Sequence, residues 1–438
     1  MNHRQERGTP METLPAAAHA DTVYLIEGPC RLTGSVPVSG AKNAALPLLA
    51  ATLLTGEECV LRHCPRIADV ALALSLLEGL GKTGAWEADG LHIREGVLRP
   101  QALGPEAAQM RASVLFLGSL LARFGKAATH PPGGCAIGKR PIDLHLAVFR
   151  ALGAQVEESE TAVVCQTSHL AGARIRLPFP SVGATENALL AAVLARGVTV
   201  LEGAAREPEV ADLAAFLQRM GARITGAGTG TLRIEGVPAL RGAVHTILPD
   251  RIEAATFLAA GAITGGNVFV EHAQSAHLEA FLGFLRQTGC SLDPQPEGIA
   301  LAAPARLRPA SVITGPYPQF PTDAQPFALA LLTLAEGTGM IRESIFENRF
   351  RQAAGLSAMG ARIAMTGQTA RVTGVPALTG AAVAAADLRG GASLILAALA
   401  ARGQSRITGG RFVERGYEAL PQKLTRLGAR IQTLPLSE

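Results

Sequence analysis

The phrase LSAMGARI at residues 356–363 decides the fold, because variants of it return at a nearly constant interval along the chain. Each variant is a helix-like apolar phrase containing a glycine, and the six glycines stand 68 to 72 residues apart. Glycine in this place is typical of a left-handed helix end that leads into a strand. Six matches therefore predict six copies of one structural unit. The other phrases are LEGLGK at 77–82, FRALGAQV at 149–156, LQRMGARI at 217–224, FLRQTGCSL at 284–292 and LTRLGARI at 424–431.

A second helix-like segment, apolar on nearly all sides and ending in glycine, lies inside each unit. A helix that is apolar all round is buried, so we expect these segments inside a ring of sheets. Short β-like runs such as VTVLEG and NVFVEH follow them. Each unit is thus predicted as strand, buried helix, strand, surface helix and further strands, which is an α/β fold with three units per domain. The six segments are 43–56, 111–125, 185–197, 251–265, 323–337 and 389–403.

Length and composition bound the class of protein. A chain of 438 residues is long enough for two domains, and 48% apolar residues can fill two cores. A net charge of +4 is too mild to indicate nucleic-acid binding. Residues 1–20 are polar and Ala-rich, so we expect a disordered extension and no signal peptide, and no later stretch is long enough to predict a membrane span. Six scattered cysteines without C-x-x-C spacing favour the cytoplasm and argue against a zinc site.

The predicted buried helices begin with polar residues. A helix N-terminus offers free N–H groups and a partial positive charge, so an added lysine or arginine makes an anion site. The alternative is that these residues only mark solvated helix starts. If the units pack with three-fold symmetry, two facing clusters of cations result, which suit a substrate carrying phosphate and carboxylate. The residues are Lys42, Asn43, Arg111, Thr185, Glu186, Arg251, Asp323 and Arg389.

Ten motifs show a resemblance to a known family. From about Asp21 onward the chain resembles the UDP-N-acetylglucosamine enolpyruvyl transferases of peptidoglycan synthesis. The motifs are SGAKNAALP at 39–47, MRAS at 110–113, PGGCAIGKRPIDLHL at 132–146, SVGATEN at 181–187, AREPE at 205–209, LPDRIEA at 248–254, FPTDAQ at 320–325, FENRF at 346–350, DLRGGASL at 387–394 and ERGYE at 414–418.

The resemblance implies an inside-out α/β barrel of two domains, each with three βαβαββ units. We expect residues 21–40 plus 249–438 to form one domain, and residues 41–248 to form the other, which carries the cysteine loop 131–141. It also implies the reaction, in which the enolpyruvyl group of phosphoenolpyruvate moves to a hydroxyl of a UDP-sugar. Phosphoenolpyruvate is then a co-substrate, and neither a cofactor nor a metal is expected.

Phosphoenolpyruvate carries a phosphate and a carboxylate, so its site must supply several cations. The planar fork of arginine suits two-point contacts with both groups. The resemblance implies that the cations are Lys42, Arg111, Arg140, Arg349, Arg389 and Arg415.

Transfer needs one acid and one base, because the methylene carbon gains a proton and the acceptor hydroxyl loses one. Cys135 follows two glycines and stands near Lys139 and Arg140, and nearby cations favour a reactive thiolate. A buried core position is the alternative, which we assign to the other five cysteines. The resemblance implies that Cys135 is the general acid, can add covalently to phosphoenolpyruvate, and is alkylated by fosfomycin. It implies that Asp323 is the base, where simple helix capping is the alternative.

The resemblance also assigns the UDP-sugar contacts. Asn43, Asp323 and Ile345 would contact the amino sugar. Arg111 would also bind the UDP-sugar. The uracil strip would be Arg140, Pro141, Ile142, Asp143 and Leu144, and the diphosphate loop would be Phe179, Pro180, Ser181, Val182 and Gly183.

Three positions depart from the family pattern. Gln352 and Gly355 stand where the family usually has His and Glu, and Phe412 falls in a phrase that usually contains His. These departures leave two other interpretations open. The chain would then be a relative that uses another uridine nucleotide in a specialised pathway, or an inactive paralogue kept for binding or regulation. The shikimate-pathway transferase is less favoured, because the PGGC loop and the uracil strip belong to the amino-sugar branch.

Overall fold

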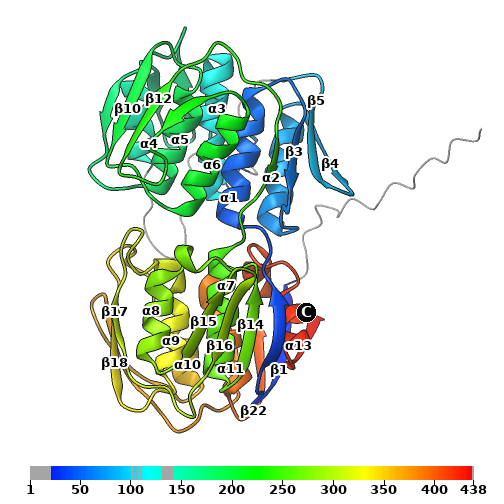
Figure 1. The fold of residues 1–438 in the computed structure, drawn as a ribbon, viewed down its shortest axis with the longest axis vertical. Coiled ribbons are helices and arrows are strands. Elements are labelled where there is room, and N and C mark those ends of the chain that lie inside the picture. The colour runs from blue at the N-terminus through cyan, green and yellow to red at the C-terminus, as the bar shows by residue number, and fades with distance from the viewer. Residues whose placement is uncertain (1–20, 100–102, 105–106, 109, 131–141, 437–438) are drawn as a thin grey trace, which may run out of the picture.

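Two α/β lobes, stacked along the long axis, make up the chain in the computed structural model (Figure 1). The structure describes residues 21–99, 103–104, 107–108, 110–130 and 142–436. The predicted N-terminal extension 1–20 and the loop 131–141 lie outside the described residues. Among the described helices, none has both the length and the apolar character that a membrane crossing needs.

The upper lobe of Figure 1 contains the described residues between 41 and 247, packed around one hydrophobic core. Its inner helices are α1 (Lys42–Ala51), α3 (Leu115–Phe124) and α5 (Val182–Ala192), and its outer helices are α2 (Ala68–Gly79), α4 (Asp143–Ala151) and α6 (Pro208–Arg219). Three sheets surround them, in the orders β13-β3-β5-β4, β6-β8-β7 and β11-β12-β10-β9. The strands are β3 (Cys59–Arg62), β4 (Lys82–Glu87), β5 (Gly90–Glu95), β6 (Lys126–Thr129), β7 (Gln155–Glu158), β8 (Val163–Gln166), β9 (Arg174–Arg176), β10 (Val198–Glu202), β11 (Arg223–Thr225), β12 (Thr231–Glu235) and β13 (Val244–Thr246).

The lower lobe repeats this plan around a second core. Its inner helices are α7 (Arg251–Ile263), α9 (Gln325–Leu332) and α11 (Leu388–Ala400), and its outer helices are α8 (Glu279–Gln287), α10 (Ala353–Ala358), α12 (Gly410–Glu414) and α13 (Leu420–Arg426). The sheets have the orders β15-β16-β14-β2, β17-β18-β20-β19 and β21-β22-β1-β23. The strands are β1 (Thr22–Gly28), β2 (Thr33–Pro37), β14 (Asn267–Glu271), β15 (Ser291–Gln295), β16 (Gly298–Ala302), β17 (Ser311–Ile313), β18 (Thr338–Arg342), β19 (Arg362–Thr366), β20 (Thr369–Thr373), β21 (Ala382–Ala384), β22 (Gly403–Thr408) and β23 (Arg430–Pro435).

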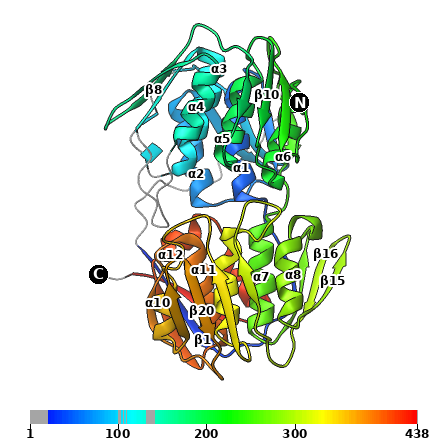
Figure 2. The ribbon, with the colours of Figure 1, turned by 90° about the vertical axis from the view of Figure 1, so that its left-hand side faces the viewer.

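The predicted α/β fold with six repeated units is confirmed. All six repeat glycines have φ between 93° and 105°, which is the left-handed conformation expected at the end of each outer helix. The inner helices are buried along almost their whole length, as in α7 and α11. Sheets lie on the outside and the inner helices lie in the middle of each lobe (Figure 2). This is the inside-out arrangement that the sequence predicts.

Two neighbouring segments connect the lobes: one joins β2 to α1 and the other joins β13 to α7. β2 pairs in parallel with β14 in the lower lobe, whereas β13 pairs in parallel with β3 in the upper lobe. The chain then crosses at a bridge between Gly40 and Pro249, and Ala41 N donates to Leu248 O at 2.8 Å. Since α1 and α7 begin directly after these crossings, their N-termini lie at the junction of the lobes.

Candidate functional site

Charged side chains from both lobes meet at this junction. The Lys42 ammonium, at the start of α1, lies 2.8 Å from a carboxylate oxygen of Asp69 in the first turn of α2. Arg415, which follows α12 in the lower lobe, donates from Nε to the other Asp69 oxygen at 2.8 Å. Asp69 is buried and lies between the two cations. The structure thus brings together two of the predicted phosphoenolpyruvate ligands, one from each lobe.

Asp323 lies between two arginines of the lower lobe. It stands in the short helix η5 (Thr322–Ala324), directly before α9. One of its oxygens accepts from Arg349 Nη2 at 2.8 Å, and the other lies 3.7 Å from Arg389 Nε. Arg349 Nη1 also contacts Asp387, the residue that caps α11 through Gly390 N. Arg349 is therefore held by protein carboxylates, and a direct contact with phosphoenolpyruvate stays a prediction.

Arg389 is a buried cation at the N-terminus of α11, with 2% of its surface exposed. Its guanidinium lies 5.1 Å from the ring centroid of Tyr417, whose hydroxyl is 2.8 Å from Thr256 Oγ1. Within the described part of the chain, Arg389 Nε and Nη1 make no hydrogen bond. A buried guanidinium with unused N–H groups is energetically costly unless an anion binds it. The arrangement is suited to receive a phosphate or a carboxylate.

Glu343 connects the predicted sugar contact to the predicted base. This fully buried carboxylate accepts from the backbone nitrogens of Ile345 and Phe346 through Oε1, at 2.8 and 3.2 Å. Its Oε2 accepts from the hydroxyl of Thr322, the neighbour of Asp323, at 3.0 Å. Ile345 and Thr322, the residue before Asp323, are thus tied to one carboxylate, although they come from separate segments.

The predicted diphosphate loop is the N-terminus of α5. Ser181 caps that helix by accepting from Ala184 N, and a side chain at Gly183 would lie 2.7 Å from the ring of His145. His145, on α4, has its Nδ1 2.7 Å from Asn187 Nδ2. Burial, with a smaller effect of the Arg111 charge, lowers the pKa of His145 to about 4. The imidazole is therefore neutral at pH 7 and fixes the distance between the two helices.

Most of the remaining described ligands occupy less enclosed positions. Asn43 and Arg111, at the starts of α1 and of η3 (Arg111–Val114), are partly exposed. The described part of the uracil strip begins α4: Ile142 is buried, Asp143 is exposed and Leu144 is intermediate. Phe179 is 45% exposed, and Pro180 and Val182 are partly exposed. Cys135, Arg140 and Pro141 lie outside the described residues.

A second ion pair crosses the junction beside α6. Arg251 Nε donates to Glu209 at 2.9 Å, and Tyr317 N donates to Glu207 at 3.4 Å. Glu186 on α5 is buried nearby, and burial together with the charges of Glu209 and Glu207 raises its pKa well above the usual range. The raised pKa favours the protonated, neutral form of Glu186, and that form reduces repulsion among the three glutamates.

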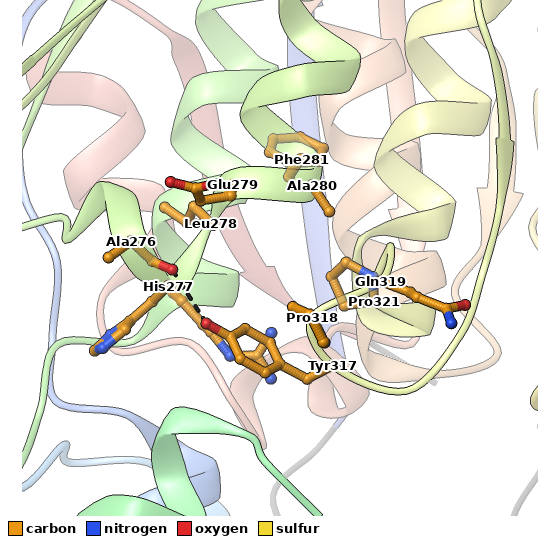
Figure 3. A pocket seen from close by; sticks show the side chains of 11 residues that line it. Ala276, His277, Leu278, Glu279, Ala280, Phe281, Tyr317, Pro318, Gln319 and Pro321 are labelled. Atoms are coloured by element: carbon orange, nitrogen blue, oxygen red, sulfur yellow. Dashed lines mark hydrogen bonds between the residues drawn. The ribbon is translucent and has the colours of Figure 1, made fainter. Parts of the chain in front are cut away.

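A cavity of about 440 Å³ adjoins this ion pair on the lower lobe (Figure 3). Its wall includes Arg251, His277, Tyr317 and Pro321, and the Tyr317 hydroxyl donates to Ala276 O at 3.1 Å. Pro321 precedes Asp323 by two residues. The lining includes Pro321 but not Asp323 itself.

A possible metal-ligating group lies elsewhere, on the sheet that contains β5. The ligand atoms of Glu87, Asp89 and His92 lie within 4.8 Å of one another. His92 already contacts Asp89 at 2.8 Å and Glu58 at 2.7 Å, and Arg94 contacts Glu87 at 2.6 Å. Since a guanidinium and both imidazole nitrogens engage these carboxylates, the group is explained by protein contacts alone.

Two of the three departures from the family pattern have structural explanations, and Phe412 has none. Gln352 is buried and donates to Gln325 on α9 at 3.2 Å. A side chain at Gly355, on α10, would lie 2.8 Å from Leu394 of α11, so glycine permits close packing there. Phe412 is partly exposed and lies 5.2 Å from the Arg411 guanidinium. Gln352 and Gly355 thus serve helix packing in the lower lobe.

Four residues of the candidate site were not predicted from the sequence: Asp69, Asp387, Glu343 and His145. Two of them had a signal, because Asp387 lies in the motif DLRGGASL and His145 in the motif ending DLHL. Asp69 and Glu343 lie outside the quoted motifs, and their partners are distant in sequence. The only sequence signal for them is general: buried cations need buried carboxylates as partners.

Comparison with known proteins supports the family resemblance of the sequence. A family model described as EPSP synthase (3-phosphoshikimate 1-carboxyvinyltransferase) matches residues 26–424. The enolpyruvyl transferase NikO from Streptomyces tendae is similar in structure, with a TM-score of 0.84 and 26% identity over 95% of this chain and 100% of that chain. An EPSP synthase from Acinetobacter baumannii shares the fold, with a TM-score of 0.73 and 19% identity over 94% of this chain and 100% of that chain.

The two-lobed fold and the family match define the class of protein, an enolpyruvyl transferase. Among curated relatives, UDP-N-acetylglucosamine 1-carboxyvinyltransferase 1 of Symbiobacterium thermophilum is 50% identical over 93% of this chain and 94% of that protein. A UDP-N-acetylglucosamine 1-carboxyvinyltransferase from Gluconacetobacter diazotrophicus is 48% identical over 93% of this chain and 98% of that protein. The chain belongs to the family of UDP-N-acetylglucosamine 1-carboxyvinyltransferases.

Proposed function

We propose that the protein transfers the enolpyruvyl group of phosphoenolpyruvate to a hydroxyl of UDP-N-acetylglucosamine and releases phosphate, the first step in making peptidoglycan precursors. The observation that carries the proposal is the buried Arg389 guanidinium, which has unused N–H groups beside Asp323 at the junction of the lobes. The names of the relatives favour this acceptor over another uridine nucleotide. The test is phosphate release from phosphoenolpyruvate in the presence of UDP-N-acetylglucosamine.

The charge of phosphoenolpyruvate is proposed to be neutralised from both lobes. Lys42 comes from the upper lobe, and Arg389 and Arg415 come from the lower lobe. Arg111, Arg140 and Arg349 complete the set as further candidates, and Arg349 also holds Asp323. Cations fixed in advance stabilise the negative charge that grows on the departing phosphate. Binding across the junction would also hold the two substrates together.

The reaction is proposed to proceed by addition and elimination. Asp323 accepts the proton of the sugar hydroxyl while the hydroxyl oxygen bonds to C2 of phosphoenolpyruvate, and Cys135 gives a proton to C3. Loss of a proton from C3 then expels phosphate and restores the double bond. The contacts of Asp323 with Arg349 and Arg389 support its part, because they fix the carboxylate in one orientation.

The UDP-sugar is proposed to lie along the upper lobe and to reach the base with its sugar. Ile142 to Leu144, with Arg140 and Pro141, would hold uracil. The turn from Phe179 to Gly183 would hold the diphosphate at the N-terminus of α5, where free N–H groups attract phosphate. Asn43 and Ile345 would contact the N-acetylglucosamine beside Asp323.

Several coarser expectations accompany this proposal. The lobes would be domains with the limits 41–248 and 21–40 plus 249–438, and the substrates would be the only small molecules required, with no cofactor or metal. The five described cysteines are free thiols, which supports a reducing compartment such as the cytoplasm. Partners would be the two substrates, without nucleic acid or membrane.

The proposed thiol acid leads to a prediction for Cys135. Wild-type enzyme should lose activity on incubation with fosfomycin, whereas Cys135→Ser should keep whatever activity it has, because a hydroxyl is a far weaker nucleophile than a thiolate. Mass spectrometry should find one added inhibitor molecule on the wild-type peptide that contains Cys135. A matched control is Cys64→Ser, since Cys64 is buried and burial raises its pKa above the usual range. Equal inactivation of wild type and Cys135→Ser would show that the thiol assignment is wrong.

A further inference from the structure

Asp69 is the point at which cations of the two lobes share one anion. Its oxygens contact Lys42 Nζ at 2.8 Å, Arg415 Nε at 2.8 Å and Arg415 Nη2 at 3.3 Å. The Asp69 side chain is 6% exposed and that of Lys42 is 12% exposed, so water screens the Lys42–Asp69 contact weakly, whereas the Arg415 side chain is 39% exposed. The Asp69–Arg415 contact joins α2 to the segment after α12, and the two residues are 346 positions apart. A carboxylate in this place affects both cations at once.

The surroundings of Lys42 are otherwise unfavourable to its charge. Burial lowers the pKa of Lys42, the Asp69 carboxylate opposes that effect, and the guanidiniums of Arg389 and Arg415 lower the pKa further. Asp250, before α7, faces the same helix start and accepts from Lys42 N at 3.2 Å. Burial alone would raise the pKa of Asp69, yet Lys42 and Arg415 outweigh it and bring the pKa below its usual range. Asp69 is therefore ionised and supports the charge on Lys42.

We propose that Asp69 is a positioning residue for the transfer reaction: it keeps the Lys42 ammonium charged and holds it opposite Arg415 before phosphoenolpyruvate binds. The inference rests on the proposed function, because it assumes that these two cations bind phosphoenolpyruvate. Asp69 acts through the cations and does not bind the substrate, since a carboxylate repels phosphate. Without it, three neighbouring cations would repel one another and Lys42 would lose its proton more easily.

The test is the pH dependence of kcat/KM for phosphoenolpyruvate in wild type and in Asp69→Asn. Deprotonated Lys42 is neutral, so kcat/KM should fall as pH rises through the pKa of Lys42. Loss of an opposite charge in direct contact lowers that pKa by about 1 to 3 units, so the fall should begin at a pH lower by the same amount. At pH 7.5 the KM for phosphoenolpyruvate should rise about tenfold or more, as for the loss of a charge-assisted contact, while the KM for the UDP-sugar should change little.

Two further variants separate positioning from simple stabilisation. Asp69→Glu keeps the charge, so its alkaline limb should stay near the wild-type position even if the longer side chain weakens binding. Glu95→Gln is a matched control, because Glu95 also bridges a buried lysine and an arginine, at 3.0 Å from Lys82 Nζ and 2.6 Å from Arg123 Nη1. That group lies at the other end of α3 from the junction, with Arg123 in the last turn. Glu95→Gln should lower the melting temperature without moving the pH profile.

The outcomes are distinguishable. If wild type releases no phosphate with UDP-N-acetylglucosamine, the proposed function fails. If wild type is active and Asp69→Asn has an unchanged pH profile and KM for phosphoenolpyruvate, only the inference about Asp69 is wrong. If Asp69→Asn does not fold, the same profile measured for Asp69→Glu decides, since an alkaline limb moved by a unit or more despite the retained charge contradicts the inference.

Discussion

Replacing Asp323 with alanine should lower kcat by about 100- to 10,000-fold, which is the usual loss for a missing general base. The uridine and diphosphate contacts would remain, so calorimetric binding of UDP-N-acetylglucosamine should change much less than turnover. Steady-state phosphate release gives kcat. The prediction follows from the position of the carboxylate, which Arg349 and Arg389 hold at the start of α9.

Asp323→Asn is the matched control for that experiment. Asparagine keeps the shape and an oxygen that can accept from Arg349, but it cannot take a proton at neutral pH. If Asp323 is the base, the asparagine variant should be nearly as slow as the alanine variant. Recovery of most of the wild-type kcat in Asp323→Asn would show that Asp323 only orients the arginines.

The second large effect is expected at Arg389. Arg389→Gln should lower kcat/KM for phosphoenolpyruvate by about 100- to 1,000-fold, because a cation aimed at the developing negative charge is lost from a buried site. The two nitrogens without hydrogen bonds in the described chain are the groups that phosphate or carboxylate would engage. Initial rates at several phosphoenolpyruvate concentrations measure the effect.

Arg402→Gln provides the control for Arg389→Gln. Arg402 is exposed and follows the opposite end of the same helix, α11. The Arg402→Gln variant should keep kcat/KM for phosphoenolpyruvate within about twofold of wild type, because exposed substitutions away from a site usually have small effects. Circular dichroism and melting temperature establish that both variants fold. A folded Arg389→Gln with wild-type kinetics would contradict the assignment of this anion site.

Much of the fold was predictable because local sequence patterns that recur along the chain determine its repeated elements. The left-handed conformation of a glycine such as Gly360 or Gly428 depends only on the helix end in which it stands. Both residues have this conformation, with φ of 94° and 99°. The all-round apolar character of residues 251–265 likewise predicts burial without knowledge of any partner. Six repetitions of such signals give the class of fold and the number of units.

The contacts that assemble the candidate site were harder to predict, since they join distant segments. The pairing of Asp69 with Arg415 depends on how the lobes meet, and nothing near Asp69 in the sequence indicates a partner 346 positions away. Glu343 accepts from Thr322 and Ile345 only because two turns of the lower lobe lie side by side. Motif resemblance predicted which residues serve as cations and as base, while the carboxylates that contact those residues required the structure.

The identity of the acceptor is the central claim, and a panel of acceptors tests it most directly. Wild-type enzyme would be incubated with phosphoenolpyruvate and, separately, UDP-N-acetylglucosamine, UDP-glucose, UMP and uridine, and released phosphate would be measured. UDP-N-acetylglucosamine should support rapid release, with a product heavier by one enolpyruvyl group, whereas UMP and uridine should support none above background. Phosphate release with UMP or uridine, and none with UDP-N-acetylglucosamine, would contradict the account.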